Sequence, residues 1–88
     1  MTRLLVISSA PVTFVDEMPF LDKKFYEGMC QYAELWSGPV SCLLRPRKAT
    51  FPFGQVFEQS QIPFGMTFLR DGQEISAQDL AGYDVVMC

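Results

Sequence analysis

The stretch Leu4-Leu5-Val6-Ile7-Ser8-Ser9-Ala10-Pro11 decides the fold class of this chain. Its first four residues are apolar without alternation, which is typical of a strand covered on both faces, as in a parallel sheet. Pro11 ends the strand because proline cannot donate to the ladder. Residues 12–20 are mixed in character and include Pro19, so they are expected to form a loop.

A helix is expected after this loop. Asp22 is a candidate N-cap, and Gly38-Pro39 ends the helix. Apolar residues recur with the 3.6-residue period of one helix face at Leu21, Phe25, Met29, Tyr32, Ala33 and Trp36.

The start of this helix has two interpretations. If Asp22 is the cap, Lys23 and Lys24 oppose the helix dipole, and a bound anion would relieve the conflict. If the helix begins earlier, near Glu17 and Pro19, both lysines lie in solvent along its middle. We favour the earlier start, because helix ends are the least certain part of a sequence-based assignment.

Three more apolar runs predict strands at Val40–Leu44, Met66–Leu69 and Val85–Cys88, with a short helix from Ser76 to Ala81. The resulting string, β-α-β-loop-β-α-β, predicts an α/β fold: a Rossmann-like half domain whose mostly parallel sheet has strand order 3-2-1-4. From the length we expect residues 1–88 to form a single domain. Because the last run reads as a buried strand, we expect this domain to be the N-terminal fragment of a longer two-domain protein.

Composition excludes several classes of protein. Hydrophobic residues make up 49% of the chain, which argues against disorder, and the net charge of −3 argues against a nucleic-acid partner. There is no histidine, which removes Ser/His and Cys/His catalysis and Cys/His zinc sites. Cys30, Cys42 and Cys88 show no C-x-x-C spacing, so neither a metal nor a disulfide framework is expected. No signal peptide or transmembrane segment is visible, and a cytoplasmic location is expected.

Candidate binding residues follow the first two strands. Ser8 and Ser9 follow the first, and Arg45 and Arg47 follow the second. In open α/β sheets ligands gather at the carboxyl ends of the strands, so these side chains are candidates for substrate binding. The plainer alternatives, which we favour on frequency, are that the serines only turn the chain and that the arginines are solvated. No catalytic residue is assigned, and the absence of G-x-G-x-x-G and Walker A motifs predicts no cofactor.

The segment over residues 45–65 is rich in phenylalanine and is expected to be a long loop, with a short helical turn around residues 55–59. Its aromatic residues are Phe51, Phe53, Phe57 and Phe64. They could form a platform for a sugar or lipid acceptor, but packing in the core is the interpretation we favour.

Several local strings resemble the start of a bacterial GT-B glycosyltransferase of family 4, the "group 1" type. They are residues 3–9 with Pro11, residues 20–36 and Tyr83-Asp84-Val85-Val86. The resemblance implies an acceptor-side domain of an enzyme that moves a sugar from a nucleotide-sugar donor to a sugar or lipid acceptor. The donor-binding domain is absent, so this part is not expected to be catalytic. The glycine-rich loop that many members carry after the first strand is missing at Ser9-Ala10-Pro11.

A second hypothesis belongs to another class of protein. The chain would then be a self-contained Rossmann-like module for binding or protein interaction, without enzymatic activity. An exposed apolar edge strand invites association, so this alternative predicts a homo-oligomer formed through that edge.

Overall fold

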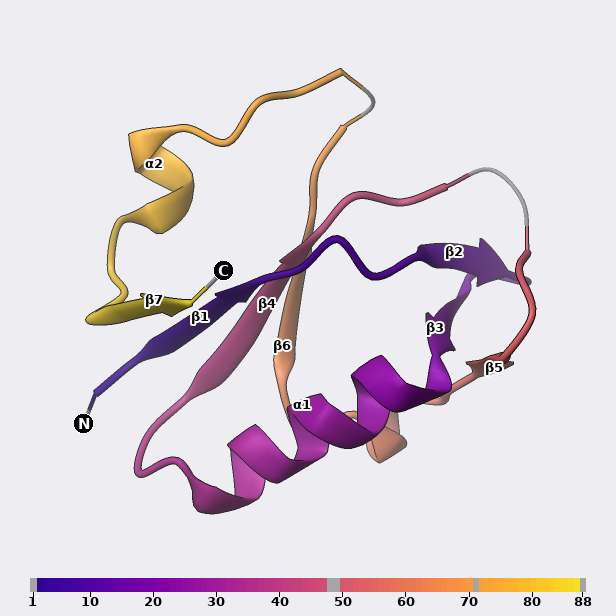
Figure 1. Cartoon of the computed structure of the whole chain (residues 1–88), viewed down its shortest axis with the longest axis horizontal. Coiled ribbons are helices and arrows are strands. Elements are labelled where there is room, and N and C mark those ends of the chain that lie inside the picture. Colours follow the sequence, from indigo (N-terminus) through magenta and orange to yellow (C-terminus); the bar gives the residue numbers. More distant parts are fainter. Residues whose placement is uncertain (1, 48–49, 71, 88) are drawn as a thin grey trace.

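The computed structural model describes residues 2–47, 50–70 and 72–87, which form two sheets and one long helix (Figure 1). In chain order the elements are β1 (Leu4–Ile7), β2 (Val12–Val15), β3 (Met18–Asp22), α1 (Lys23–Leu35), β4 (Val40–Leu44), β5 (Gly54–Val56), the 3-10 turn η1 (Gln59–Gln61), β6 (Gly65–Phe68), α2 (Ala77–Leu80) and β7 (Val85–Met87). The predicted α/β class is confirmed.

The larger sheet is parallel throughout and has the order β6-β4-β1-β7. Among the four strands of this sheet, β6 is the third in the chain, β4 the second, β1 the first and β7 the fourth. The order in the whole chain nevertheless differs from the predicted 3-2-1-4, because three further strands, β2, β3 and β5, form a separate antiparallel sheet.

Strand β1 lies between two hydrophobic clusters. Leu4 and Val6 face a cluster that includes Met29 of α1, whereas Leu5 and Ile7 face a second cluster that includes Leu43. Successive side chains of a strand point to opposite faces, so both faces of β1 are covered. This arrangement explains why the run Leu4–Ile7 is apolar without alternation.

The expected loop over residues 12–20 is instead a hairpin of β2 and β3. Asp16 and Glu17 form its two-residue turn, with φ angles of 50° and 67°. The common sequence of such a turn is Asn-Gly or Asp-Gly, and here Glu17 replaces the glycine, so the sequence lacks the usual hairpin signal. Pro19 is tolerated because no hydrogen bond is required from its nitrogen at this position. Its carbonyl oxygen accepts from the Phe57 N–H at 3.0 Å, and β5 has already ended at Val56.

Helix α1 begins at Lys23, and the favoured earlier start is wrong because residues 18–22 belong to β3. The predicted N-cap is confirmed, since the Phe25 N–H donates to Asp22 Oδ1 at 3.0 Å. Lys23 and Lys24 therefore lie in the first helical turn, where both are exposed. On the predicted apolar stripe Met29 is buried, whereas Tyr32 is 40% exposed.

The predicted loop over residues 45–65 contains strand β5, which pairs with β3. The expected helical turn at residues 55–59 is wrong, because β5 occupies its start and the 3-10 turn comes later, at Gln59–Gln61. Phe57 stacks on Tyr26 with ring centroids 3.9 Å apart, and Phe64 is also buried. Packing is thus confirmed for both rings, whereas Phe53 is 84% exposed.

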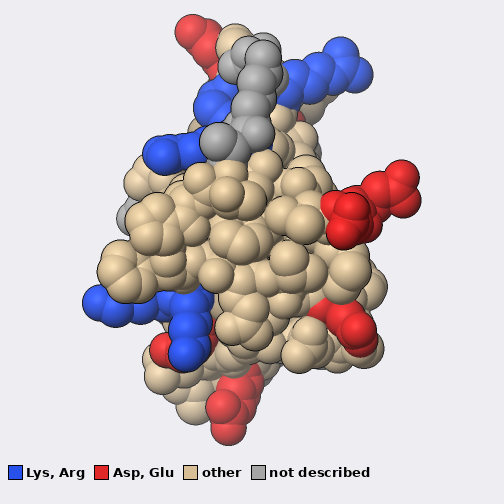
Figure 2. All heavy atoms as spheres, turned by 90° about the vertical axis from the view of Figure 1, so that its right-hand side faces the viewer, with Lys and Arg blue, Asp and Glu red and all other residues tan. Residues whose placement is uncertain are grey.

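Figure 2 shows the side of the molecule that carries β2, β3 and β5. The middle of this surface is uncharged, and charged side chains lie around its margin. Phe14, in β2, is 45% exposed and contacts Phe68 edge to face, with ring centroids 5.0 Å apart. The antiparallel sheet is therefore tied to the parallel sheet at β6 by an aromatic contact.

Strand β7 differs from its prediction as a buried strand. Val85 and Val86 are 36% and 39% exposed, because β7 pairs with β1 on one side and lies at the edge of the sheet on the other. Cys88, which was expected to be buried, lies outside the described residues. Cys42, within the predicted strand Val40–Leu44, is fully buried.

Two glycines offer a matched test of this packing. A Cβ at Gly28, inside α1, would meet nothing within 4 Å, so Gly28→Ala should raise the free energy of unfolding by up to about 1 kcal/mol through helix propensity. A Cβ at Gly38 would fall on the carbonyl oxygen of Thr2, so Gly38→Ala should lower that free energy by about 1–3 kcal/mol. Urea unfolding followed by circular dichroism measures both. Equal stability of Gly38→Ala and the parent would contradict the close approach of Thr2.

Burial raises the pKa of the Cys42 thiol from 9.0 to about 12. Between these values the unfolded chain binds fewer protons than the folded one, so stability falls as the pH rises through that window and is unaffected below it. Wild type should lose roughly 1 kcal/mol per pH unit more than Cys42→Ala above pH 9. Urea unfolding at several pH values measures the two slopes. The stability difference between wild type and variant should stay constant between about pH 6 and 8; parallel curves above pH 9 would refute the burial effect.

Candidate functional site

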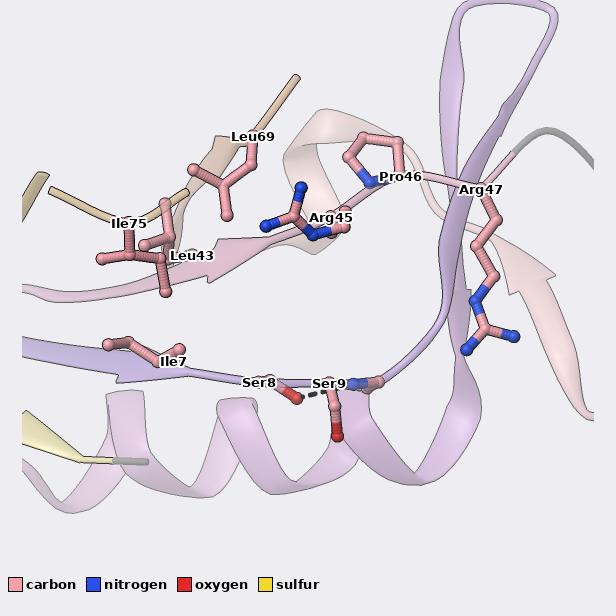
Figure 3. A pocket seen from close by; sticks show the side chains of 10 residues that line it. Ile7, Ser8, Ser9, Leu43, Arg45, Pro46, Arg47, Leu69 and Ile75 are labelled. Carbon is pink, nitrogen blue, oxygen red and sulfur yellow. Dashed lines mark hydrogen bonds between the residues drawn. The ribbon is translucent and has the colours of Figure 1, made fainter. Parts of the chain in front are cut away.

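A hollow of about 890 Å³ lies at the carboxyl ends of β1 and β4 (Figure 3). Its lining includes all four side chains predicted for binding: Ser8, Ser9, Arg45 and Arg47. They meet because β1 and β4 pair in parallel with Ile7 opposite Leu43, so both strands end at the same edge of the sheet. The structure thus brings together residues that lie up to 39 positions apart in the chain.

Ser8 holds the turn that follows β1. Its hydroxyl oxygen accepts from the Ala10 N–H at 3.0 Å, and its own N–H donates to the Leu43 carbonyl at 3.3 Å. The plainer interpretation of Ser8 as a turn residue is therefore confirmed. Ser9 is exposed, and among the residues described its hydroxyl has no hydrogen-bond partner. Ser9 is the serine whose hydroxyl is available to a ligand.

Arg45 is exposed, but both terminal nitrogens of its guanidinium are already hydrogen-bonded within the protein. Its guanidinium donates to the Arg70 carbonyl at 3.1 Å and to the Gln73 carbonyl. The same turn is closed by the Gln73 N–H, which donates to the Arg70 carbonyl at 3.0 Å. Arg45 therefore holds the turn after β6 against the end of β4, which is a positioning role.

Arg47 is attached to the hairpin through its backbone alone. Its N–H donates to the Val12 carbonyl at 2.7 Å, and its carbonyl accepts from the Thr13 hydroxyl at 2.6 Å. The side chain is exposed, and no described residue hydrogen-bonds or ion-pairs with its guanidinium. Arg47 is the cation of this hollow that can reach a ligand.

Sequence analysis missed the apolar part of the lining. Ile7, the last residue of β1, pairs with Leu43, the last but one of β4, and both lie on the same face, a placement that the parallel pairing of two continuous apolar runs could have indicated. Leu69 follows β6 and is 6% exposed, whereas Ile75 lies in the segment before α2 and is 40% exposed. No local sequence pattern indicates that Ile75 lines the hollow, because it lies in an irregular segment that follows the turn held by Arg45.

The electrostatics of the hollow favour an anion. Among the described residues that line it there are two arginines and no acidic side chain, although the chain carries a net charge of −3. Within residues 2–47, 50–70 and 72–87, no three His, Cys, Asp or Glu side chains gather as metal ligands. The arrangement can hold a negatively charged group at one end and apolar atoms at the other.

Comparison of the chain with protein-family models, with curated proteins and with solved structures finds no match. The resemblance to glycosyltransferases therefore stays a prediction. In the part of the chain that the structure describes, no helix has the length and apolar character needed to cross a membrane.

The role of Arg45 can be tested by hydrogen exchange. Arg45→Gln removes two charge-assisted bonds to the turn, so exchange of the Gln73 amide should rise about fivefold, equivalent to about 1 kcal/mol of local stability. Arg47→Gln carries the same charge change without touching this turn and should leave the Gln73 amide unaltered. Unchanged exchange in Arg45→Gln would show that the turn does not depend on the guanidinium.

Proposed function

We propose that the chain is the N-terminal, acceptor-side portion of a GT-B type glycosyltransferase, built on a Rossmann-like half domain. The whole enzyme would move a sugar from a nucleotide-sugar donor to a sugar or lipid acceptor. The observation that carries the proposal is the hollow at the carboxyl ends of β1 and β4, lined by Ser8, Ser9, Arg45 and Arg47. This edge is where open parallel sheets bind their ligands.

Within this proposal the lining residues divide their tasks. Arg47 binds an anionic group of the acceptor, and the Ser9 hydroxyl offers it a hydrogen bond. Ser8 and Arg45 hold the walls, because their side chains are already bonded to the backbone. None of these residues is given a catalytic role, and the nucleotide-sugar donor would be held by a second domain.

A second candidate is a self-contained binding or interaction module. The observation in its favour is β7, an edge strand on which Val85 and Val86 are about one-third exposed. An uncovered apolar edge favours association with another strand. A homo-oligomer formed through β7 would then be the functional unit.

Titration of the ¹⁵N-labelled chain, followed by nuclear magnetic resonance, separates the two candidates. The acceptor-side proposal expects sugar phosphates to shift the amide signals of Ser9, Arg47 and Ile75, while UDP-glucose binds at least about tenfold more weakly. Arg47→Gln should weaken the sugar-phosphate shifts. Arg3→Gln, which removes the same charge at the amino end of β1, should not.

Two results would contradict the acceptor-side proposal. One is tight binding of UDP-glucose at the hollow, and the other is the absence of any sugar-dependent shift there. A dimer in sedimentation experiments, with the amides of Val85 and Val86 protected from exchange, would favour the interaction module instead.

A further inference from the structure

We infer that the hollow takes an amphiphilic anion: a phosphate or carboxylate on Arg47, joined to a short apolar chain that lies over Ile7, Leu43, Leu69 and Ile75. The inference rests on the proposed function, since it names the chemical class of acceptor at the same site.

The two ends of the hollow differ in chemistry. Figure 3 shows Ile7, Leu43, Leu69 and Ile75 gathered at one end, with Ser8, Ser9 and Arg45 between them and Arg47. A ligand that used both ends must therefore be elongated, with its charge at one end. The volume of about 890 Å³ is ample for such a molecule.

The apolar end is incompletely covered by the protein. Leu43 and Leu69 are buried in the second cluster beside β1, but Ile75 at the rim remains 40% exposed. Its segment is not loose, because Arg45 ties the preceding turn to the end of β4. An alkyl chain placed here would remove the exposed surface of Ile75 from water, which is the favourable term for binding.

The charged end selects an anion. Both terminal nitrogens of Arg45 already donate to backbone carbonyls, whereas no described residue hydrogen-bonds the guanidinium of Arg47. Arg47 is therefore the arginine that can offer two parallel N–H donors to a phosphate or carboxylate. The hollow has no acidic side chain among its described lining residues. An inorganic anion would use Arg47 alone and an alcohol would use the apolar wall alone, whereas an amphiphilic anion uses both.

A short ligand series tests this directly on the full chain by isothermal titration calorimetry. The probes are inorganic phosphate, butyl phosphate, hexyl phosphate, hexanoate and 1-hexanol. Each added methylene should tighten binding of the alkyl phosphates by about two- to fourfold. Inorganic phosphate and 1-hexanol should each bind at least about tenfold more weakly than hexyl phosphate. The comparison of hexanoate with hexyl phosphate shows which charged group the site prefers.

Three variants assign the effects to the two ends. Arg47→Gln should weaken hexyl phosphate about tenfold and leave 1-hexanol unchanged. Ile75→Ser, at an exposed position, should reduce the dependence on chain length without changing the binding of inorganic phosphate, because Ile7, Leu43 and Leu69 remain. Arg3→Gln is the charge-matched control outside the hollow and should bind all probes as the parent does. Dispersed amide spectra show that each variant is folded.

The inference is overturned if hexyl phosphate binds no tighter than inorganic phosphate, or if Arg47→Gln binds it as well as the parent. The measurements distinguish failure of this inference from failure of the proposed function. Chain-length-dependent binding at the hollow without any sugar-dependent shift would support the amphiphilic anion and refute the glycosyltransferase. Sugar-phosphate binding without chain-length dependence would do the reverse.

Discussion

The parallel pairing of β1 on both its sides is the constraint on which the rest of the structure depends. With β4 on one side and β7 on the other, β1 can satisfy its backbone hydrogen bonds only from within the sheet. Its side chains are apolar on both faces because both faces are covered, one by the cluster under α1 and the other by the cluster opposite. The same pairing aligns the carboxyl ends of β1 and β4, where the hollow lies.

The hollow is built by side chains with distinct tasks. Ser8 and Arg45 are bonded to backbone groups, so their contribution is to keep the turn after β1 and the turn after β6 in place. Arg47 is held by its backbone to β2 and keeps its guanidinium unoccupied by the described residues. A chain with an overall negative charge thus presents a local cation beside apolar atoms, which is a combination that favours amphiphilic anions.

The parts of the fold that depend on local patterns follow from the sequence. Asp22 caps α1 as its side-chain type and position indicate, and the continuous apolar runs become the strands of the parallel sheet. The hairpin of β2 and β3 does not follow, because Glu17 adopts a positive φ angle that glutamate rarely adopts. Pro19 also argues against a strand, because proline cannot donate a ladder hydrogen bond. Only the pairing in the folded structure shows that no such bond is required at this position.

For the candidate site, the sequence by itself determined which side chains follow the strand ends, because the order of apolar runs predicts where each strand stops. Only the tertiary structure decided which of them remain available to a ligand. The bonds of Arg45 join it to carbonyls 25 and 28 positions away, and Thr13 reaches the Arg47 carbonyl 34 positions on. Contacts of this kind form between segments whose approach is set by the packed sheets, so no local pattern of residues can reveal them.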